Sequence, residues 1–324
     1  MNRTGSLPGA SDSGSGFAVV GAGALGRWLS AVLASVGADV KLVTRPGTDT
    51  GQTVCRIEGS TTLVEEVPSG PAEGFIAAGC RWLLLCTKAV DLEVAAREAA
   101  SLLAPGGTMV VLSNGLGHAE TLRGLGFHRC VAATVTYGLF ASPDGFVQRR
   151  GDGGEVAIGP LVCAGSGLPA EDVATVEEAH ELARWLGDAG LRVRVVEDGA
   201  GLVWHKAMLN AGLNPVAALL GCENGVLPEH PAFGLSIEAA REVLEVVASA
   251  GVELAVDPEQ ALRGLCRDTA TNRCSTLQDL DAGRQTEMDW ICGAVVRLAE
   301  QEAGSAPVNR FLGALVQNAE TARI

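Results

Sequence analysis

Three polar residues recur at intervals of four in a segment that is otherwise apolar. Lys206, Asn210 and Asn214 lie within residues 203–215, where apolar residues repeat at helical spacing with no helix breaker before Gly212. Residues four apart share one face of a helix, so the lysine and the two amides form a polar row. Unpaired polar groups on a buried helix are costly, so the row predicts a ligand site, with a solvated stripe or a satisfied core network as the alternatives. A lysine ammonium in such a site can stabilise negative charge on an oxygen and donate a proton to it.

Composition excludes several classes of partner. The chain has 324 residues, of which 47% are hydrophobic, and a net charge of -14 without any basic run. This length is sufficient for two domains with their own cores, and the charge argues against nucleic acid or an anionic membrane as a partner. No run of 18 apolar residues occurs, so we expect no transmembrane helix. The first fifteen residues are small and polar, which predicts a disordered tail rather than a signal peptide.

The nine cysteines do not form a recognisable framework. Their number is odd, no Cys-x-x-Cys pair occurs, and no cluster of cysteine and histidine has the spacing of a zinc site. We interpret them as reduced thiols, which are typical of a reducing compartment. The sequence therefore predicts a cytoplasmic protein without a metal.

A glycine-rich turn follows a short apolar strand near the start of the chain. Residues 17–20 form the strand, a helix over 27–35 follows the turn, and a second strand covers 39–43. In this setting Gly-x-Gly-x-x-Gly is typical of dinucleotide binding. The first glycine permits the tight turn, the second lets backbone approach a pyrophosphate, and the third lets helix and strand pack closely. The turn consists of Gly21, Ala22, Gly23, Ala24, Leu25 and Gly26.

The residue after the second strand indicates which dinucleotide binds. An NAD-specific site usually has an acid there, which accepts hydrogen bonds from the ribose hydroxyls. Here the segment is Val43-Thr44-Arg45-Pro46, and the Arg45 guanidinium offers a planar set of donors to a 2′-phosphate. We therefore predict NADPH as the cofactor, with a solvated surface arginine as the alternative for Arg45.

Strands and helices continue to alternate as far as residue 196. We predict strands over 82–86, 108–112, 130–136, 146–150, 155–158 and 192–196, and helices over 91–103 and 173–186. Lys88 and Asn114 each follow a strand, and ligands bind at the carboxyl ends of parallel strands. Both residues are candidates for contact with the cofactor. A solvated loop lysine and a simple Asn-Gly turn are the alternatives.

From about residue 198 the strand signals stop. We predict helices over 201–221, 232–250, 258–270, 279–302 and 308–321, the fourth of which carries Glu287. The predicted organisation is a tail over 1–15, a Rossmann-type α/β domain over 16–197 and an all-α domain over 198–324. The polar row of Lys206 then opens the helical domain, close to the cleft between the two.

These segments, in this order, resemble the ketopantoate reductase (2-dehydropantoate 2-reductase) family over residues 17 to about 316. The resemblance implies a Rossmann domain followed by a helical domain like the C-terminal one of 6-phosphogluconate dehydrogenase. NADPH and a small 2-oxo acid would meet between them. The implied activity is reduction of 2-dehydropantoate to pantoate, in pantothenate biosynthesis. Besides the glycine turn, the matching segments are 87–89, 113–117, 204–206, Asn210, 214–215, 224–225, 275–279 and 286–289.

The resemblance also implies roles for single residues. Lys206 matches the catalytic lysine, which serves as general acid for the oxygen that gains negative charge. Glu287 matches a position near the reacting centre that contacts the cofactor, with a surface ion pair as its alternative. Lys88 and Asn114 match cofactor-contacting positions. The positions matched to substrate binding are Asn210, Asn214, Asn224 and Ser275.

Three positions depart from the family's usual pattern. The family usually has Gln or His where Ser113 stands and Thr where Val216 stands. It often has Ser-Ser-Met where this chain has Cys274-Ser275-Thr276. Because these changes flank the matched residues, a second hypothesis stays open, in which a different 2-oxo acid, ketone, lactone or imine is reduced.

Two hypotheses come from other classes of protein. The β-hydroxyacid dehydrogenases also combine a Rossmann half, a helical half and a lysine four residues before an asparagine. Their glycine-rich substrate loop has no match in this chain. A non-catalytic NADPH-binding protein would require the polar row to be purely structural. The sequence leaves the assembly state open, a homodimer included.

Overall fold

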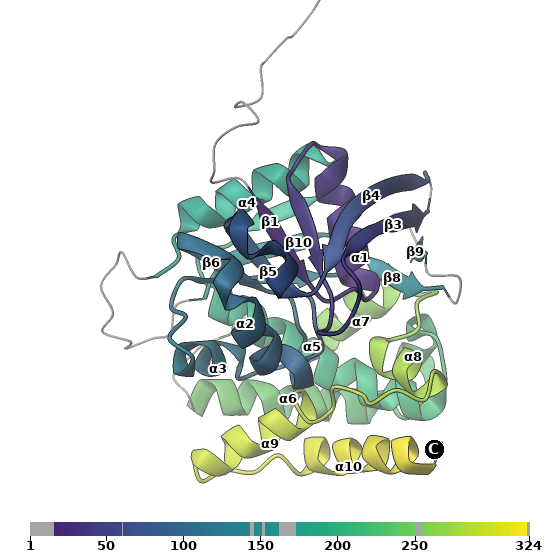
Figure 1. The fold of residues 1–324 in the computed structure, drawn as a ribbon. Coiled ribbons are helices and arrows are strands. Elements are labelled where there is room, and N and C mark those ends of the chain that lie inside the picture. Colours follow the sequence, from purple (N-terminus) through teal and green to yellow (C-terminus); the bar gives the residue numbers. More distant parts are fainter. Residues whose placement is uncertain are drawn as a thin grey trace, which may run out of the picture.

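A single sheet organises the first half of the protein (Figure 1). The computed structural model describes residues 16–59, 61–142, 146–150, 153–161, 173–249 and 254–322. The tail predicted over 1–15 and Cys163 lie outside these ranges. The strand order is β11-β10-β7-β6-β5-β1-β2-β4-β3-β9-β8. The strands are β1 (Phe17–Val20), β2 (Val40–Val43), β3 (Gly51–Glu58), β4 (Leu63–Gly70), β5 (Cys80–Leu85), β6 (Leu103–Val111), β7 (Cys130–Val135), β8 (Gly138–Ala141), β9 (Val147–Arg150), β10 (Val156–Pro160) and β11 (Val193–Val195).

The centre of the sheet is parallel and covered by helices on both faces. From β7 through β6, β5, β1 and β2 to β4, each strand pairs in parallel with the next. Phe17 and Val19 of β1 pack with α1 (Ala24–Ser35) and α4 (Val176–Asp188). Ala18 and Val20 pack with α2 (Leu92–Ala99) and α3 (His118–Gly124) on the other face. This doubly wound arrangement confirms the predicted Rossmann-type half, because continuous apolar strands require cover on both sides.

Three strands were not predicted from the sequence. The hairpin of β3 and β4 is antiparallel and carries few buried residues; in β3 only Cys55 and Ile57 are buried. The short strand β8 pairs antiparallel with β9, and β9 pairs in parallel with β3. These strands depend on pairing between distant segments rather than on a local apolar pattern, so sequence periodicity gave little signal for them.

The second half is helical and is built around one long helix. It comprises α5 (Gly199–Leu220), α6 (Phe233–Ser249), α7 (Pro258–Asp268), α8 (Ser275–Asp281), α9 (Cys292–Gln301) and α10 (Pro307–Ala322). The helix α5 packs on α6, α7, α8 and α10, and also on β7 and β10 of the sheet. Figure 1 shows α9 and α10 on the side of the molecule away from the sheet. No described helix has the length and hydropathy needed to cross a membrane.

The prediction of one helix over 279–302 was wrong. The helix α8 ends at Asp281, and α9 begins only at Cys292. Gly283 has φ +61°, in the left-handed region where glycine commonly ends a helix. Glu287 therefore lies on an irregular segment between two helices rather than on a helix.

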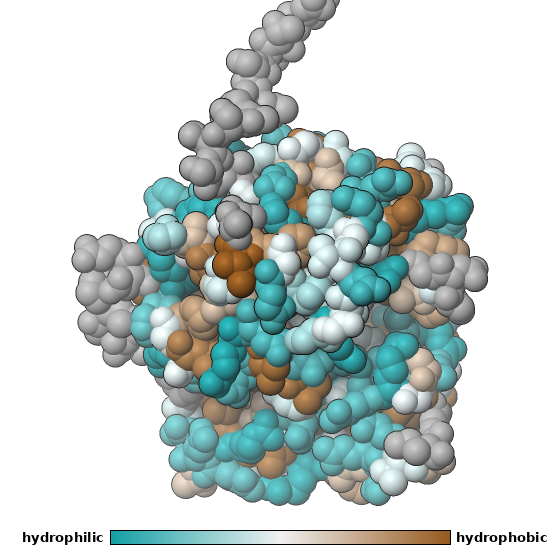
Figure 2. Space-filling view, in the orientation of Figure 1, coloured by the Kyte–Doolittle hydropathy of each residue, from teal (hydrophilic) through white to brown (hydrophobic). Residues whose placement is uncertain are grey.

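The face of the molecule drawn in Figure 2 is mostly polar, with brown apolar residues scattered among teal ones. Its grey residues belong to segments outside the described ranges. Large continuous apolar patches are the usual mark of a docking surface. Among the described residues, this face shows no continuous apolar patch of that kind.

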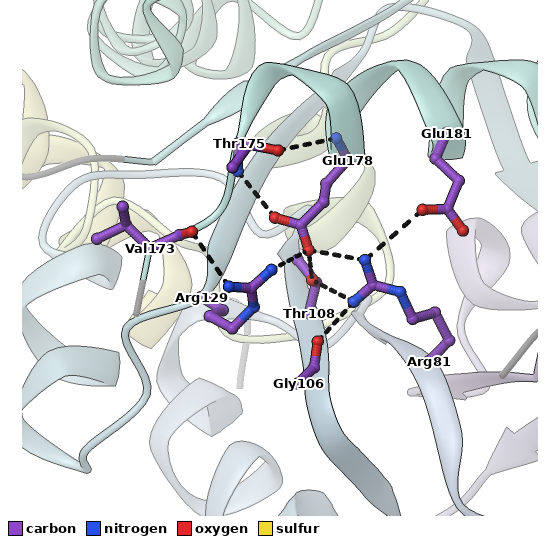
Figure 3. Close-up of polar contacts among 8 residues, drawn as sticks. All are labelled: Arg81, Gly106, Thr108, Arg129, Val173, Thr175, Glu178 and Glu181. Atoms are coloured by element: carbon purple, nitrogen blue, oxygen red, sulfur yellow. Dashed lines mark hydrogen bonds and ion pairs between the residues drawn. The ribbon is translucent and has the colours of Figure 1, made fainter. Parts of the chain in front are cut away.

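A buried carboxylate joins α4 to the sheet (Figure 3). One Glu178 oxygen accepts hydrogen bonds from Thr108 (2.7 Å), Arg81 (2.8 Å) and Arg129 (2.6 Å). The other accepts from the Thr175 amide (2.8 Å), and the Thr175 hydroxyl accepts from the Glu178 amide (3.2 Å). Burial alone would raise the pKa of Glu178, but the bonds from Thr108, Arg81, Thr175 and Arg129 lower it to about 2.

Replacing Glu178 by alanine is expected to lower the free energy of unfolding by about 3 kcal/mol at pH 7, because two arginines lose their shared acceptor. The pKa of Glu178 is lowered on folding. Its contribution is therefore complete above about pH 4.3, the ordinary value, and is lost as pH falls towards 2. Urea unfolding at pH 7 and pH 3 measures both effects. The control is Glu238→Ala in an exposed pair with Arg241, which should change stability by less than about 1 kcal/mol. Equal unfolding midpoints for Glu178→Ala and wild type at pH 7 would contradict this account.

Candidate active site

The glycine turn between β1 and α1 has the geometry that its sequence predicts. Gly21 has φ +108°, and a Cβ there would lie 3.1 Å from the backbone of Cys86. A Cβ on Gly26 would lie 1.8 Å from the Gly21 carbonyl oxygen. No atom lies within 4 Å of the corresponding point at Gly23, the N-cap residue of α1. The turn is therefore closed at its ends and open at its middle, where free amides and the helix dipole favour an anion.

A cavity of about 310 Å³ is lined by residues of both halves, and the whole polar row of α5 lines it. Lys206, Asn210 and Asn214 are joined there by Asn224 and Ser275 from the segments that follow α5. From the Rossmann half come Ala24, Leu25 and Asn114. Apart from Glu287, all the site residues predicted in the helical half therefore line one cavity, and part of the glycine turn lines it as well. This volume is at the lower end of the range typical of small-molecule sites.

The ammonium of Lys206 is in an unusual electrostatic environment. Burial lowers its pKa to about 8, and the negative charge of Glu287 partly opposes that shift. In the part of the chain that the structure describes, no carboxylate oxygen lies within 4.0 Å of Lys206 Nζ, so the ammonium makes no ion pair there. The amine can therefore gain and lose a proton near neutral pH, which suits a group that transfers one.

Two amide side chains at the cavity have unmatched polar atoms. Asn214 is 3% exposed and Asn224 is 4% exposed. Asn214 Nδ2 and Asn224 Oδ1 are buried without a hydrogen-bond partner. Asn224 Nδ2 donates to Thr269 Oγ1 at 2.9 Å. A buried polar atom without a partner costs about 1–3 kcal/mol, so these atoms fit a site that a polar ligand completes.

Glu287 connects the two halves but does not line the cavity. Its Oε1 accepts from the Ala89 amide and its Oε2 from Asn114 Nδ2, both at 2.9 Å. Burial raises the pKa of Glu287, while the bonds from Asn114 and Ala89 and the charge of Lys88 partly oppose this. Beside it the Leu116 amide donates to the Trp290 carbonyl at 3.0 Å. The carboxylate thus holds Asn114, which does line the cavity.

The remaining cofactor candidates lie outside the cavity lining. The Lys88 ammonium pairs with Asp279 at 2.8 Å and also donates to the Gln285 carbonyl, so it contacts the helical half. The side chain of Arg45 is 89% exposed, and its nearest acid is Asp91 at 3.7 Å. The Gly21 amide donates a hydrogen bond to the Val43 carbonyl at 2.9 Å. Because Arg45 is two residues after Val43, it lies near the glycine turn.

Several residues of the cavity were not predicted from the sequence. They are Tyr137, Gly138 and Phe140 on or beside the unpredicted strand β8, Arg150 on β9, and Thr269, Asn272, Arg273 and Gln278 from the end of α7 into α8. The strand of Arg150 was predicted over 146–150, but its pairing with β8 was not, because β8 itself was not recognised. Cys274, one of the departures from the family pattern, is buried here and its Sγ lies 3.5 Å from the Asn214 carbonyl.

The comparison with known proteins covers nearly the whole chain. The family profile described as ketopantoate reductase PanE/ApbA matches residues 17–162, and the profile of its C-terminal part matches residues 200–320. The curated 2-dehydropantoate 2-reductase of Archaeoglobus fulgidus is 31% identical over 94% of this chain and 97% of its own length. That of Pyrococcus horikoshii is 28% identical over 94% and 97%. The chain belongs to the ketopantoate reductase family.

Solved structures of the ketopantoate reductase family share the architecture described above. A PanE/ApbA family ketopantoate reductase from Ralstonia eutropha JMP134 has a TM-score of 0.78 and 27% identity, and covers 95% of this chain and 98% of its own. A D-mandelate dehydrogenase solved with NADH and anilino(oxo)acetate has the same fold, with a TM-score of 0.81, 22% identity and coverage of 95% and 98%. The predicted fold class, a Rossmann-type half followed by a helical half, is confirmed. In the described ranges, no three His, Cys, Asp or Glu side chains are grouped so that they could hold a metal ion.

Proposed function

We propose that this protein reduces 2-dehydropantoate (ketopantoate) to pantoate with NADPH. The observation that carries the proposal is that Lys206, Asn210 and Asn214 line one cavity together with Asn114 of the Rossmann half. The curated relatives with 28–31% identity are named 2-dehydropantoate 2-reductase. The alternative of a non-catalytic NADPH-binding protein gives no reason for a half-buried lysine in this cavity whose pKa is about 8.

The residues present fit a nicotinamide dinucleotide. Backbone amides of the turn that follow Gly21, at the start of α1, would hold the pyrophosphate. Arg45 would contact the 2′-phosphate, and Asn114 would contact the cofactor where it enters the cavity. For Lys88 to contact the cofactor, its ammonium must exchange Asp279 for a cofactor oxygen. When bound, NADPH would supply the hydride that reduces the carbonyl carbon.

The side chains of the helical half would bind and protonate the substrate. Lys206 is mainly protonated at pH 7, so it can donate a hydrogen bond to the substrate oxygen and then transfer the proton. Asn210 and the unmatched Asn214 Nδ2 would hold that oxygen or a neighbouring hydroxyl. Ser275, with the backbone amides near it, would hold the carboxylate, and Asn224 would accept from a substrate hydroxyl. Glu287 would act near this centre by holding Asn114 and raising the pKa of Lys206.

Two departures from the family pattern favour a second candidate, the reduction of another 2-oxo acid. Cys274 lines the cavity, adjoins Ser275 in sequence and contacts the backbone of Asn214. Val216, where the family usually has Thr, is buried in the core of the helical half, two residues after Asn214. The described cysteines are all free thiols, and we further propose a reducing compartment such as the cytoplasm. The domain boundary near residue 198 and a homodimer stay predictions.

Absorbance of the reduced cofactor tests the function directly. With ketopantoate, purified protein should oxidise NADPH with a higher kcat/KM than NADH. Arg45→Ala should raise KM for NADPH about tenfold, since a charge-assisted hydrogen bond contributes about 1.5 kcal/mol or more. KM for NADH should not change. Oxidation with other 2-oxo acids but not with ketopantoate would support the second candidate. Binding of NADPH without oxidation for any carbonyl would support the non-catalytic one.

A further inference from the structure

One face of the ribbon formed by β8 and β9 is directed at the helical half. In this ribbon Gly138 pairs with Arg150, and Phe140 pairs with Gln148. Residues directly opposite in an antiparallel pair, and residues two apart on a strand, share a face. A Cβ on Gly138 would lie 2.6 Å from the side-chain amide of Asn272, so this shared face is turned towards the helical half. Arg150 and Phe140 on this face both line the cavity.

Arg150 is exposed, and two contacts within the ribbon orient its guanidinium. It lies over the Phe140 ring at 4.8 Å, and its Nε donates to Gln148 Oε1 at 3.2 Å. No carboxylate in the described ranges pairs with it, whereas Arg273, also in the lining, pairs with Asp281. The two terminal nitrogens of Arg150 are therefore available, in the geometry that binds a carboxylate through two parallel hydrogen bonds.

Within the described part of the chain, the cavity lining thus contains two cations that lack a paired acid, Lys206 and Arg150, one from each half of the protein. Lys206 and Ser275 are assigned above to the carbonyl and the carboxylate of a 2-oxo acid, which leaves Arg150 uncompensated. Leu209, Leu213 and Leu265 add apolar surface to the same lining. A 2-oxo acid with an apolar spacer and a second anion would complement these groups.

We propose that Arg150 makes the enzyme selective for 2-oxo acids that carry a second carboxylate at the end remote from the carbonyl. The proposal rests on the second candidate of the proposed function, the reduction of another 2-oxo acid, because ketopantoate carries only one carboxylate. It assumes that the 2-oxo acid group binds at Lys206 and Ser275. Arg150 contacts the substrate in this proposal and does not contact the cofactor. Charge-assisted bidentate pairing then distinguishes a diacid from a monoacid of the same chain length.

Matched pairs of substrates test the assignment in the full-length protein with NADPH. The pairs are 2-oxoglutarate with 2-oxopentanoate, and 2-oxoadipate with 2-oxohexanoate. In at least one pair, the diacid should have a kcat/KM about 10- to 100-fold higher, mainly through a lower KM. In Arg150→Gln the kcat/KM for that diacid should fall to the value for its monoacid, while KM for NADPH stays constant.

Arg149→Gln is the matched control. Arg149 is the preceding residue on the same strand, but its guanidinium lies over the Tyr137 ring at 4.7 Å and does not line the cavity. This variant should keep the preference for the diacid. If Arg149→Gln abolished the preference as fully as Arg150→Gln, the contact would not belong to Arg150 and the assignment would be wrong.

Other outcomes separate this proposal from the proposed function. If wild type reduced both members of every pair equally, or if Arg150→Gln weakened both members equally, selectivity through Arg150 would be overturned while 2-oxo acid reduction still stood. If no 2-oxo acid were reduced, the proposed function would fail. Calorimetric binding of the same pairs in the presence of NADPH would then decide the matter. Tighter binding of the diacid to wild type but not to Arg150→Gln would support the contact, and equal binding would reject it.

Discussion

Lys206→Ala is expected to lower kcat by about 10²–10⁴-fold, the usual contribution of a placed general acid. Without the ammonium, the substrate oxygen that gains negative charge has neither its stabilising charge nor its proton donor. The glycine turn that would hold the dinucleotide is on the other half of the protein, so the dissociation constant for NADPH should change by less than about threefold. Single-turnover kinetics and a fluorescence titration with NADPH measure the two quantities separately.

The pH dependence of the wild-type enzyme gives an independent check on the same residue. The reaction requires the protonated lysine, and the pKa of Lys206 is about 8. The value applies to the protein before the 2-oxo acid binds, so kcat/KM for the 2-oxo acid should be level below pH 8 and fall about tenfold per pH unit above it. In Lys206→Arg the side chain keeps its charge but does not release the proton in this range. That variant should be slow without the fall near pH 8.

His205 supplies the control for these variants. It is adjacent to Lys206 in sequence but lies about 100° round the helix, and it does not line the cavity. His205→Ala should retain kcat within about threefold. Turnover of Lys206→Ala at the wild-type rate would show that the lysine is not the acid.

Glu287→Gln is expected to lower kcat about 10- to 100-fold at pH 8. An uncharged amide keeps only one acceptor for the two donors, the Ala89 amide and Asn114 Nδ2, so Asn114 loses its fixed position in the cavity. A small displacement of a positioning group can cost about 10²-fold in rate. The carboxylate also raises the pKa of Lys206, so its removal should move the fall in kcat/KM to a lower pH.

The pH profile distinguishes this electrostatic effect from a general loss of structure. A variant that merely unfolded would lose amplitude without moving the midpoint of the profile. Asp289→Asn is the control, because Asp289 is on the same segment, is exposed, and pairs with Arg297 away from the cavity. It should leave both kcat and the midpoint unchanged. An unshifted midpoint in Glu287→Gln would mean that the charge of Glu287 does not act on Lys206.

The sequence was informative wherever the structure depends on local periodicity or on turn geometry. Spacing alone placed Lys206, Asn210 and Asn214 on one face of α5, and the structure brings all three to one cavity. The glycine turn was equally predictable, because Gly21 and Gly26 occupy positions that leave no space for a side chain.

The unpredicted parts depend on contacts between distant segments. Arg150 lines the cavity only because β9 pairs with β8, and Gly138 lets this ribbon approach Asn272 closely. The predicted helix over 279–302 was wrong because the apolar pattern resumes after an irregular segment. Glu287 on that segment bonds instead to the Rossmann half. Neither pairing has a local signature in the sequence.

The way in which α5 begins limits how this protein can be recombined with its relatives. A Cβ on Gly199, its first residue, would lie 2.5 Å from the Pro160 carbonyl oxygen, and one on Gly159 would lie 2.9 Å from the Cα of Gly199. The first residue of α5 therefore packs directly against the end of β10, and only later residues of α5 pack in the core of the helical half. A chimera joined at the nominal boundary near residue 198 would place foreign side chains in that contact. Grafts that transfer the substrate half should carry β10 with α5, or keep glycine on both sides of the junction.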